Sequence, residues 1–372
     1  MAVEITRRDY SLIGRDTKLA EERGLASAQW YACAIPRDRL KELMRRRDGP
    51  ALRDTLLWFV LLIFTGTLSW LAWGTWWAIP AFAVYGVLYC SASDSRWHEC
   101  GHRTAFKRTW MNDIVYQMAS FMVLRESVPS LWSHTRHHTD TIIVGRDPEI
   151  AAPRPPDLPG IALNILNLKN APKELRKIGL HCFGRLTREE KTYIPDSERG
   201  KVYWIARVYA LIFLGVAGWC AAIGSILPAM FIGLPSLYGA WLMQVFALTQ
   251  HAGLAEDVLD HRLNCRTVYM NPVFRFLYWN MNYHVEHHMF PMVPYHALPA
   301  LHQEMKSDTP KPYRNLLDAY REIIPALLRQ VTDPAYYVKR ELPESAKPVP
   351  VSIPAAQAER YVLNATKVKN TP

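Results

Sequence analysis

Cysteine is scarce in this chain of 372 residues, and its six cysteines form no C-x-x-C pair. They stand at Cys33, Cys90, Cys100, Cys182, Cys220 and Cys265. Such scattered positions give no support for a disulfide framework, a zinc knuckle or an iron–sulfur cluster. They indicate reduced thiols in a protein that faces the cytoplasm.

A signal peptide is also missing, because the start is charged at Arg7, Arg8 and Asp9 and the first apolar run begins only near Leu56. There is no glycine-rich dinucleotide fingerprint and no fused haem module. The net charge of +10 does not indicate nucleic-acid binding, since Lys and Arg are spread along the polar segments. We expect no nucleic-acid partner, and we assign these cations to the cytoplasmic loops of a membrane protein.

Hydrophobic residues make up 49% of the chain, with 13 Trp, 18 Tyr and 12 Phe, yet the mean hydropathy is only -0.10. These values indicate a few membrane spans joined to a substantial polar part. Four apolar segments approach the ~20 residues that a helix needs to cross the ~30 Å hydrocarbon core. They cover about 56–73, 76–92, 202–223 and 226–248.

Short uncharged turns join these segments in pairs, at Gly74-Thr75 and Gly224-Ser225, so each pair is expected to form a helical hairpin. Cations flank the open ends of both hairpins. They are Arg45, Arg46 and Arg47 before the first segment, Arg96, Arg103, Lys107 and Arg108 after the second, and Arg199 and Lys201 before the third. By the positive-inside rule, both termini and the middle of the chain are cytoplasmic. The expected fold is an all-α integral membrane protein, with four transmembrane helices in two hairpins and a cytoplasmic helical cap.

The same patterns divide the chain into a cytoplasmic N-terminal segment (1–50), a membrane domain (51–305), a cytoplasmic amphipathic helix (306–340) and a flexible tail (341–372). The run 114–124 is too short to span and predicts an interfacial or re-entrant helix. Segment 151–159 predicts a loop, and 163–178 a further helix. In the C-terminal helix, apolar residues recur at helical spacing around a bend expected at Pro325. They are Leu316, Leu317, Tyr320, Ile323, Ile324 and Leu327.

Nine of the thirteen histidines stand in an ordered pattern. His98 and His102, in HECGH, are one helical turn apart and share one helix face. The sequences HTRHH and HVEHH each place three imidazoles at positions i, i+3 and i+4, which also share a face. These six are His134, His137, His138, His284, His287 and His288, and His251 ends the fourth apolar segment. The remaining four, His181, His261, His296 and His302, show no pattern.

Eight or nine imidazoles exceed the coordination number of one ion, so two metals with four or five histidines each is the simplest division. Imidazole suits Fe, Zn, Cu and Ni alike. A hydrolytic zinc site normally uses about three protein ligands and a carboxylate base. A histidine-rich pair with open positions therefore favours oxygen activation by iron. A zinc-dependent membrane hydrolase and a non-catalytic membrane scaffold are the alternatives.

The boxes HECGH, HTRHH and YHVEHHMFP, with QH between the last two, resemble the membrane fatty acid desaturase and hydroxylase superfamily. The resemblance covers roughly 56–301 and includes Asn271-Pro272 and the run RFLYWNMNYHVEHHMFP. It implies a non-haem site of two iron ions that uses O2 to oxidise an unactivated C–H bond. The ligands that it implies are His98, His102, His134, His137, His138, His251, His284, His287 and His288.

The resemblance implies a hydrophobic substrate, usually a fatty acyl chain, in contact with membrane lipid. HECGHRTAFK is also similar to the bacterial dihydrorhizobitoxine desaturase type, which favours a small amino acid enol ether as substrate and the bacterial inner membrane as location. Desaturation is favoured over hydroxylation, because the three boxes together resemble those of acyl-lipid desaturases most. Without a redox domain of its own, the chain needs electrons from a separate donor, such as a ferredoxin-like protein.

Several further side chains are candidates for roles around the metals. Carboxylates that could orient the ligating histidines are Asp94, Glu99, Asp140, Asp147 and Glu286. Aromatic rings that could line a substrate tunnel are Trp97, Phe106, Trp132 and Trp279. Cations that could receive an acidic electron donor are Arg103, Lys107 and Arg108. Cys100, which lies between two ligands, is interpreted as a small packing residue.

Overall fold

The computed structural model describes residues 8–348, and within this range the chain is helical, with two isolated β-bridges and no strand. The α-helices in chain order are α1 Arg15–Glu22, α2 Arg37–Leu43, α3 Asp48–Leu71, α4 Ala78–Gly86, α5 Ala92–Gly101, α6 Thr109–Met122, α7 Ser127–Thr139, α8 Leu158–Leu163, α9 Asn170–Cys182, α10 Arg199–Ile223, α11 Leu227–Phe231, α12 Pro235–Tyr238, α13 Trp241–His251, α14 His261–Asn264, α15 Pro272–Leu277, α16 His284–Met289, α17 Leu298–Met305 and α18 Leu316–Thr332. Five short helices of other types, η1 Val87–Ser91, η2 Asn164–Leu166, η3 Glu190–Thr192, η4 Asp196–Glu198 and η5 Tyr295–Ala297, complete them.

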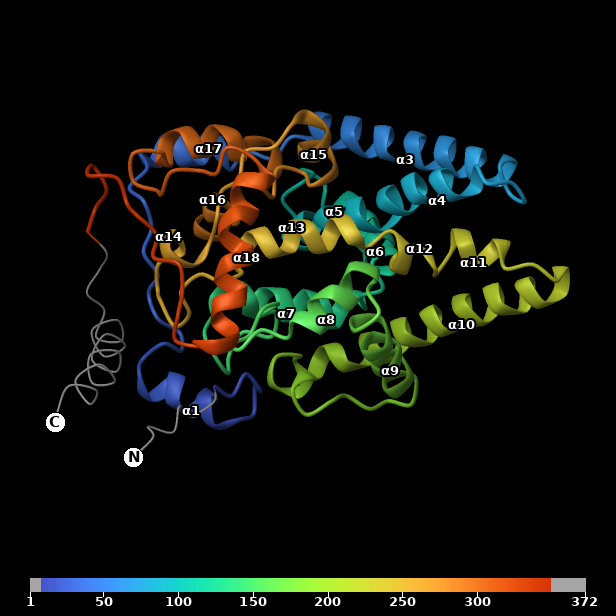
Figure 1. The fold of residues 1–372 in the computed structure, drawn as a ribbon, viewed down its shortest axis with the longest axis horizontal. Coiled ribbons are helices and arrows are strands. Elements are labelled where there is room, and N and C mark those ends of the chain that lie inside the picture. Colours follow the sequence, from blue (N-terminus) through green and yellow to red (C-terminus); the bar gives the residue numbers. More distant parts are fainter. Residues whose placement is uncertain (1–7, 349–372) are drawn as a thin grey trace.

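Two helical hairpins project from one side of the molecule (Figure 1). The first pairs α3 with α4, and the second pairs α10 with α11. The turn of the second hairpin follows Gly224, whose positive φ of 58° ends α10. Large apolar side chains, such as Ile63, Trp76 and Leu211, stand exposed along both hairpins. Exposed apolar surface of this extent is typical of a face that contacts lipid.

Three helical stretches are long and apolar enough to cross a membrane, Arg37–Leu71, Asp196–Ile223 and Leu227–His251. They coincide with the first, third and fourth predicted spans. The second predicted span forms helix α4, which continues without interruption through η1 into α5. Polar residues such as Ser91, Ser93 and Asp94 follow its apolar half, so the helix as a whole is less apolar than the other three.

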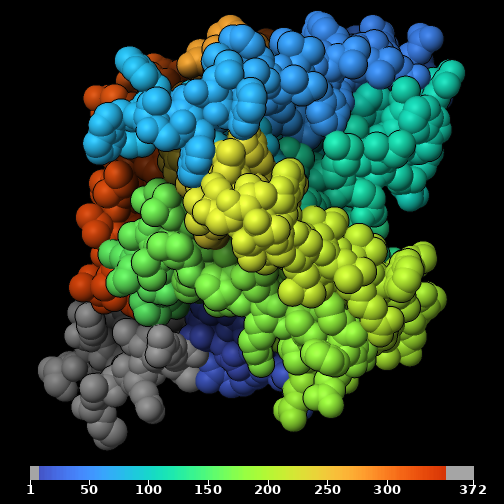
Figure 2. Space-filling model, turned by 90° about the vertical axis from the view of Figure 1, so that its right-hand side faces the viewer, coloured from blue at the N-terminus to red at the C-terminus, as the bar shows by residue number. Residues whose placement is uncertain are grey.

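The fourth predicted span is broken into α11, α12 and α13 rather than being one regular helix. Pro228 and Pro235 cannot donate a backbone hydrogen bond, and Gly233, with a φ of 98°, turns the chain out of the helical conformation between them. Seen from the hairpin side, the broken stretch α11–α12 packs between the first hairpin and α10 (Figure 2). Phe231 contacts the rings of Phe82 and Tyr85 there.

The break lets two backbones approach each other closely where η1 crosses α12. A Cβ atom on Gly239 would lie 1.9 Å from the carbonyl oxygen of Gly86. The Ser91 hydroxyl donates a hydrogen bond to the Gly239 carbonyl oxygen at 2.6 Å and accepts one from the Met243 amide at 2.8 Å. This crossing joins the helix that carries HECGH to the helix that ends at His251.

We expect Gly239→Ala to destabilise the protein, because the new methyl group would overlap the Gly86 backbone. Overpacking of this kind costs about 1–3 kcal/mol, and more where backbone must move. Gly215→Ala on α10 is the matched control, since its Cβ would meet nothing within 4 Å. Thermal unfolding in detergent should show a lower midpoint for Gly239→Ala alone. Equal midpoints for the two variants would contradict the close approach.

The remaining helices form the end of the molecule away from the hairpin tips (Figure 1). The expected helix at 163–178 is wrong in its bounds, because Asn167 adopts a left-handed conformation (φ 54°) and separates η2 from α9. The predicted C-terminal helix is α18, which contains Pro325 and packs on α13. Of the expected flexible tail, Ser345 and Lys347 hydrogen-bond the 307–308 turn, and residues 349–372 lie outside the described range.

Candidate metal centre

The nine patterned histidines come from four helices that meet in the interior. His98 lies in α5, and His102 caps the end of that helix. The HTRHH histidines lie in the last turns of α7, and the HVEHH histidines fill most of the short helix α16. His251 is the last residue of α13. Helical spacing thus gives each box one histidine face, as the sequence predicts.

Packing of the four helices divides the nine histidines into two groups, within each of which the possible ligand atoms lie within 4.8 Å of one another. The first group is His98, His102, His134, His138 and His287. The second group is His137, His251, His284 and His288. Each group combines helices that are distant in sequence, and α7 and α16 contribute to both. The division into four and five matches the sequence expectation.

Within each group the Nε2 atoms face one another. The Nε2 atom of His134 lies 3.1 Å from that of His102 and 3.1 Å from that of His138. In the second group, the Nε2 atom of His284 lies 3.0 Å from those of His251 and His288. Two nitrogens bound to one ion at about 2.1 Å and at right angles would stand about 3.0 Å apart. The separations therefore fit two metal ions, each at the centre of one group.

The protonation states also fit metal binding, which requires neutral imidazoles. Burial and the surrounding imidazoles hold the pKa of His98 and His287 well below the usual value, and the same holds for His284 and His288. His137 differs, because Asp147 outweighs the effect of burial and raises its pKa. The Nδ1 atoms of His98 and His284 are buried without a hydrogen-bond partner.

Four outer groups contact Nδ1 atoms of the candidate ligands. Asp147 accepts a hydrogen bond from His137 at 2.8 Å, and Glu149 accepts one from His134 at 3.0 Å. Thr141 lies 3.2 Å from the Nδ1 atom of His288. The Asn264 carbonyl oxygen lies 2.8 Å from the Nδ1 atom of His251. Such partners fix the tautomer and the ring orientation of a metal ligand.

Of the five carboxylates singled out from the sequence, Asp147 alone forms such a bond in the described part of the chain. The four others have different partners. Asp94 pairs with Arg125 at 3.1 Å, Asp140 pairs with Arg136 and Arg146, and Glu286 accepts hydrogen bonds from His302 and Thr267. Glu99 accepts from Thr104 and from the Tyr295 amide. Their positions in or beside the boxes suggested contact with the histidines, but their side chains have other partners.

The aromatic candidates also divide. Trp97 contacts the rings of His98 and His134, with centroids 6.1 and 5.2 Å away. Trp279 instead stacks on Tyr295, away from the ligands, and Phe106 and Cys100 are buried in the core. Burial of Cys100 fits its interpretation as a packing residue.

Sequence reasoning missed Glu149 and His261. Glu149 stands two residues after Asp147, and the Glu149 amide donates a hydrogen bond to the Asp147 carboxylate. Two acidic residues in the loop that follows a histidine box were the signal in the sequence that could have identified Glu149. His261 is isolated in sequence, yet its ring centroid lies 5.2 Å from that of His288. Only the tertiary fold brings it to the centre.

We expect Glu149→Gln to weaken metal retention or turnover by about 10–100-fold, because losses of outer partners typically have this size. The amide keeps the shape of the side chain and removes its charge. Glu189→Gln is the control, because the Glu189 carboxylate accepts an exposed hydrogen bond from the Ser11 hydroxyl. Metal content after dialysis against a chelator measures the effect. Equal retention in the two variants would show that Glu149 does not support the centre.

Comparison with known proteins agrees with the geometry. The fatty acid desaturase family matches residues 74–319, which is more than half of the chain and contains all nine histidines. The chain therefore belongs to the fatty acid desaturase family. As a member of this family it is expected to be an oxidoreductase of the membrane.

Several curated proteins are similar to this chain. The Delta(12) fatty acid desaturase FAD2 of Calendula officinalis is 25% identical over 268 residues, which are 63% of this chain and 66% of the relative. A Delta(12) acyl-lipid conjugase (11E,13E-forming) of Impatiens balsamina is 28% identical over 138 residues, 37% of this chain and 32% of the relative. A Delta(12)-acyl-lipid-desaturase of Punica granatum is 31% identical over 90 residues, 24% of this chain and 21% of the relative. The chain thus matches less than two thirds of the length of each of these relatives.

Proposed function

We propose that this protein is a membrane-bound, O2-dependent desaturase that holds two iron ions and introduces a double bond into a fatty acyl chain. The observation that carries the proposal is the division of nine histidines, six of them buried and three partly buried, into groups of five and four. Such a donor set contains no thiolate that an oxidant would destroy. Iron is the metal of choice because imidazole ligands and open positions suit the activation of oxygen.

The overall reaction balances with an external electron donor. The substrate loses two hydrogen atoms from neighbouring carbons. Two molecules of a one-electron donor protein supply two electrons, and two protons come from solvent. Together these four electrons and four protons reduce O2 to two molecules of water. When bound, the metal pair supplies the oxidant. The protein would hold the metal pair with nine imidazoles that are buried or partly buried, and Asp147 and Glu149 keep two of them in fixed orientations.

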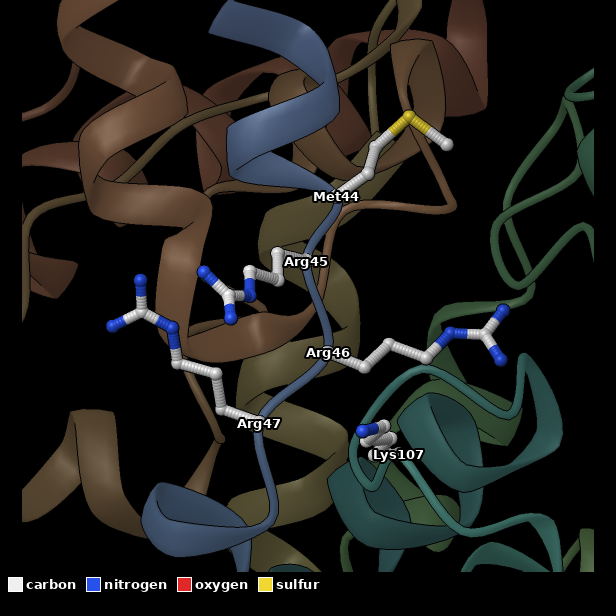
Figure 3. A pocket seen from close by; sticks show the side chains of 5 residues that line it. All are labelled: Met44, Arg45, Arg46, Arg47 and Lys107. Atoms are coloured by element: carbon white, nitrogen blue, oxygen red, sulfur yellow. The ribbon is translucent and has the colours of Figure 1, made fainter.

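A basic pocket beside the first hairpin supports an acyl substrate with an anionic head group. The pocket has a volume of about 630 Å³ and is lined by Met44 and four cations, Arg45, Arg46, Arg47 and Lys107 (Figure 3). No ion pair joins any of these four side chains to a carboxylate in the part of the chain that the structure describes. Like charges this close favour binding of an anion.

The pocket adjoins the helix that carries the first histidine box. Burial raises the pKa of Glu99, next to His98, to about 7, and the charge of Arg46 acts in the opposite direction. Arg46 is therefore near enough to α5 to affect its buried carboxyl group. If a lipid phosphate or a thioester carrier binds in this pocket, the acyl chain attached to it begins beside the hairpins, where apolar surface is exposed.

We expect the double variant Arg46→Glu, Lys107→Glu to raise the KM for an acyl substrate by about 10–100-fold with a small change in kcat, since it removes binding that is uniform along the reaction. Lys306→Glu, an exposed cation outside the pocket, is the control. Initial rates against substrate concentration separate the two constants. An unchanged KM for the double variant would exclude the pocket as the head-group site.

Comparative lipid and metabolite profiling tests the proposed function. Cells that express the wild-type chain, and cells that express His287→Ala, are grown on a defined fatty acid in air. A new double bond in the acyl chains of the wild-type cells alone would support the proposal. Unchanged lipids with an altered small polar metabolite would favour the specialised amino acid enol ether. A hydroxylated product would assign the chain to the hydroxylases, and no product with any substrate would favour a scaffold.

The membrane arrangement that we propose keeps four spans in two hairpins, with both termini and the metal centre on the cytoplasmic side of a bacterial inner membrane. Both hairpins project from the same side of the molecule, which supports it (Figure 1). Cysteine labelling from either side of oriented vesicles tests this. A cysteine introduced into the 72–77 turn should be labelled from the periplasmic side only. A cysteine introduced by Gln303→Cys on α17 should be labelled from the cytoplasmic side only.

A further inference from the structure

The metal centre that we propose is buried, so electrons from a separate donor protein must cross part of the protein to reach it. This question rests on the proposed function. Electron transfer weakens steeply with the distance that has to be crossed through saturated groups, and π-systems in contact shorten that distance. Aromatic rings that contact the nine histidines and also reach the surface would therefore provide a route for electrons.

Two rings outside the nine contact a ligand ring in the described part of the chain, those of Trp97 and His261. Trp97 is buried, and its further neighbour is the guanidinium group of Arg125, 4.2 Å from the ring centroid. A guanidinium group accepts and releases no electrons, so this contact ends the aromatic series. The His261 ring, in contrast, leads on to another aromatic side chain.

Trp30 stacks on His261, with ring centroids 4.3 Å apart and planes only 3° from parallel. His261 is buried, and its centroid lies 5.2 Å from that of His288 in the second group. Trp30 is partly exposed, so the series of three rings joins solvent to a metal ligand.

The backbone around Trp30 holds the stack in place. The Trp30 indole N–H donates to the Thr139 carbonyl oxygen at 3.1 Å, at the end of the helix that carries HTRHH. The neighbouring Tyr31 amide donates to the Leu259 carbonyl oxygen at 2.9 Å. The segment between α1 and α2 therefore runs beside α14, on the end of the molecule away from the hairpin tips (Figure 1). A water-soluble donor can reach this end.

We propose that Trp30 and His261 form the entry route for electrons, from a reduced one-electron donor docked over Trp30 to the metal that is held by His288. Each transfer oxidises one donor protein and reduces the metal pair by one electron, so two donors are consumed for each double bond. The rings act as a bridge, and neither is itself oxidised. No proton needs to move along the route, because solvent supplies the two protons of the overall reaction.

The test is the anaerobic reduction of the iron-loaded protein by a reduced two-iron ferredoxin. The loss of ferric absorbance is recorded as the reaction proceeds. The measured quantity is the limiting first-order rate at saturating ferredoxin, which separates electron transfer from docking. Trp30→Leu should lower this rate by roughly tenfold, which equals about 1.4 kcal/mol of activation free energy. Trp30→Phe, which keeps a ring, should stay near the wild-type rate. Trp204→Leu, an exposed tryptophan on α10, is the control.

A second measurement separates this route from the proposed function. Each variant is fully reduced with dithionite, mixed once with substrate and O2, and its product counted. Equal product from wild type and Trp30→Leu, with equal iron content, confirms that the metal centre is intact and that only delivery is slowed. If Trp30→Leu loses iron, Trp30→Met takes its place as the non-aromatic variant. An unchanged ferredoxin-dependent rate in the iron-loaded non-aromatic variant would overturn the route, whereas absence of product from the reduced wild type would overturn the proposed function.

Discussion

Substitution of a single ligand in either histidine group should abolish turnover and remove about one of two metal ions per chain, because each ion depends on its own group. His102→Ala leaves the five-histidine group with four ligands, and His251→Ala leaves the four-histidine group with three. The second variant should therefore lose its metal more readily. His251 also ends α13, the last piece of the broken fourth span, whose position depends on the crossing at Gly239.

Metal analysis and turnover on the same samples check this prediction. His296→Ala is the matched control, since His296 is partly exposed and lies in neither group. It should retain both ions and full activity. Full activity in His251→Ala would mean that His251 is not a ligand. Loss of both ions in each ligand variant would show that the two groups bind metal as one cooperative unit.

The second large effect is expected at a buried charged triad outside the metal centre. His181 on α9 hydrogen-bonds Glu126 at 2.5 Å and Glu190 at 3.1 Å, and all three side chains are at most 2% exposed. Glu126 directly precedes α7, the helix of HTRHH, so the triad ties α9 and the loop at Glu190 to that helix. His181→Ala should cost about 3–5 kcal/mol, because it leaves the Glu126 carboxylate buried without its cation and leaves Glu190 with Lys177 alone, 3.9 Å away.

The same triad predicts how stability depends on pH. Burial lowers the pKa of His181, but the bonds to Glu126 and Glu190 outweigh it and raise the pKa to about 9. Because the unfolded chain has a histidine pKa of about 6.5, the stabilisation is complete below that pH and is lost as the pH rises through about 9. The unfolding midpoint of the wild type should fall over this interval more than that of His181→Ala.

Unfolding in detergent at pH 6, 7.5 and 9.5 measures both effects. Arg103→Ala is the control for a surface ion pair, since Arg103 and Asp113 are 57% and 47% exposed and such pairs contribute about 0–1 kcal/mol. Equal stability of His181→Ala and Arg103→Ala would show that the triad is not charged in the folded protein. A wild-type midpoint that stays level from pH 7.5 to 9.5 would show the same.

The histidine faces of the boxes were predictable because they depend on local geometry. Histidines at i, i+3 and i+4 share a helix face wherever the helix lies, so HTRHH and HVEHH define their faces from sequence alone. The first and third predicted spans were also local, since a long uninterrupted apolar run needs no tertiary information. The helical character of the chain from residue 8 to residue 348 follows from the same patterns.

Features that depend on contacts between distant segments were not predictable. The broken fourth span could be suspected from Pro228 and Pro235, but the close approach at Gly239 requires η1 to lie opposite it. The roles of Glu149 and His261 follow from loops that return to the centre, and no periodicity marks such loops. The opposite error occurred at Glu286, which lies between two ligands in sequence but points to His302.

The metal content of the purified protein tests the central claim most directly. Wild-type chain prepared without chelator, and analysed for iron, zinc, copper and nickel together, should contain about two iron ions per chain, because two histidine groups each fit one ion. His102→Ala and His251→Ala should each contain about one. A single zinc ion per chain, with activity that does not depend on O2, would contradict the two-iron desaturase.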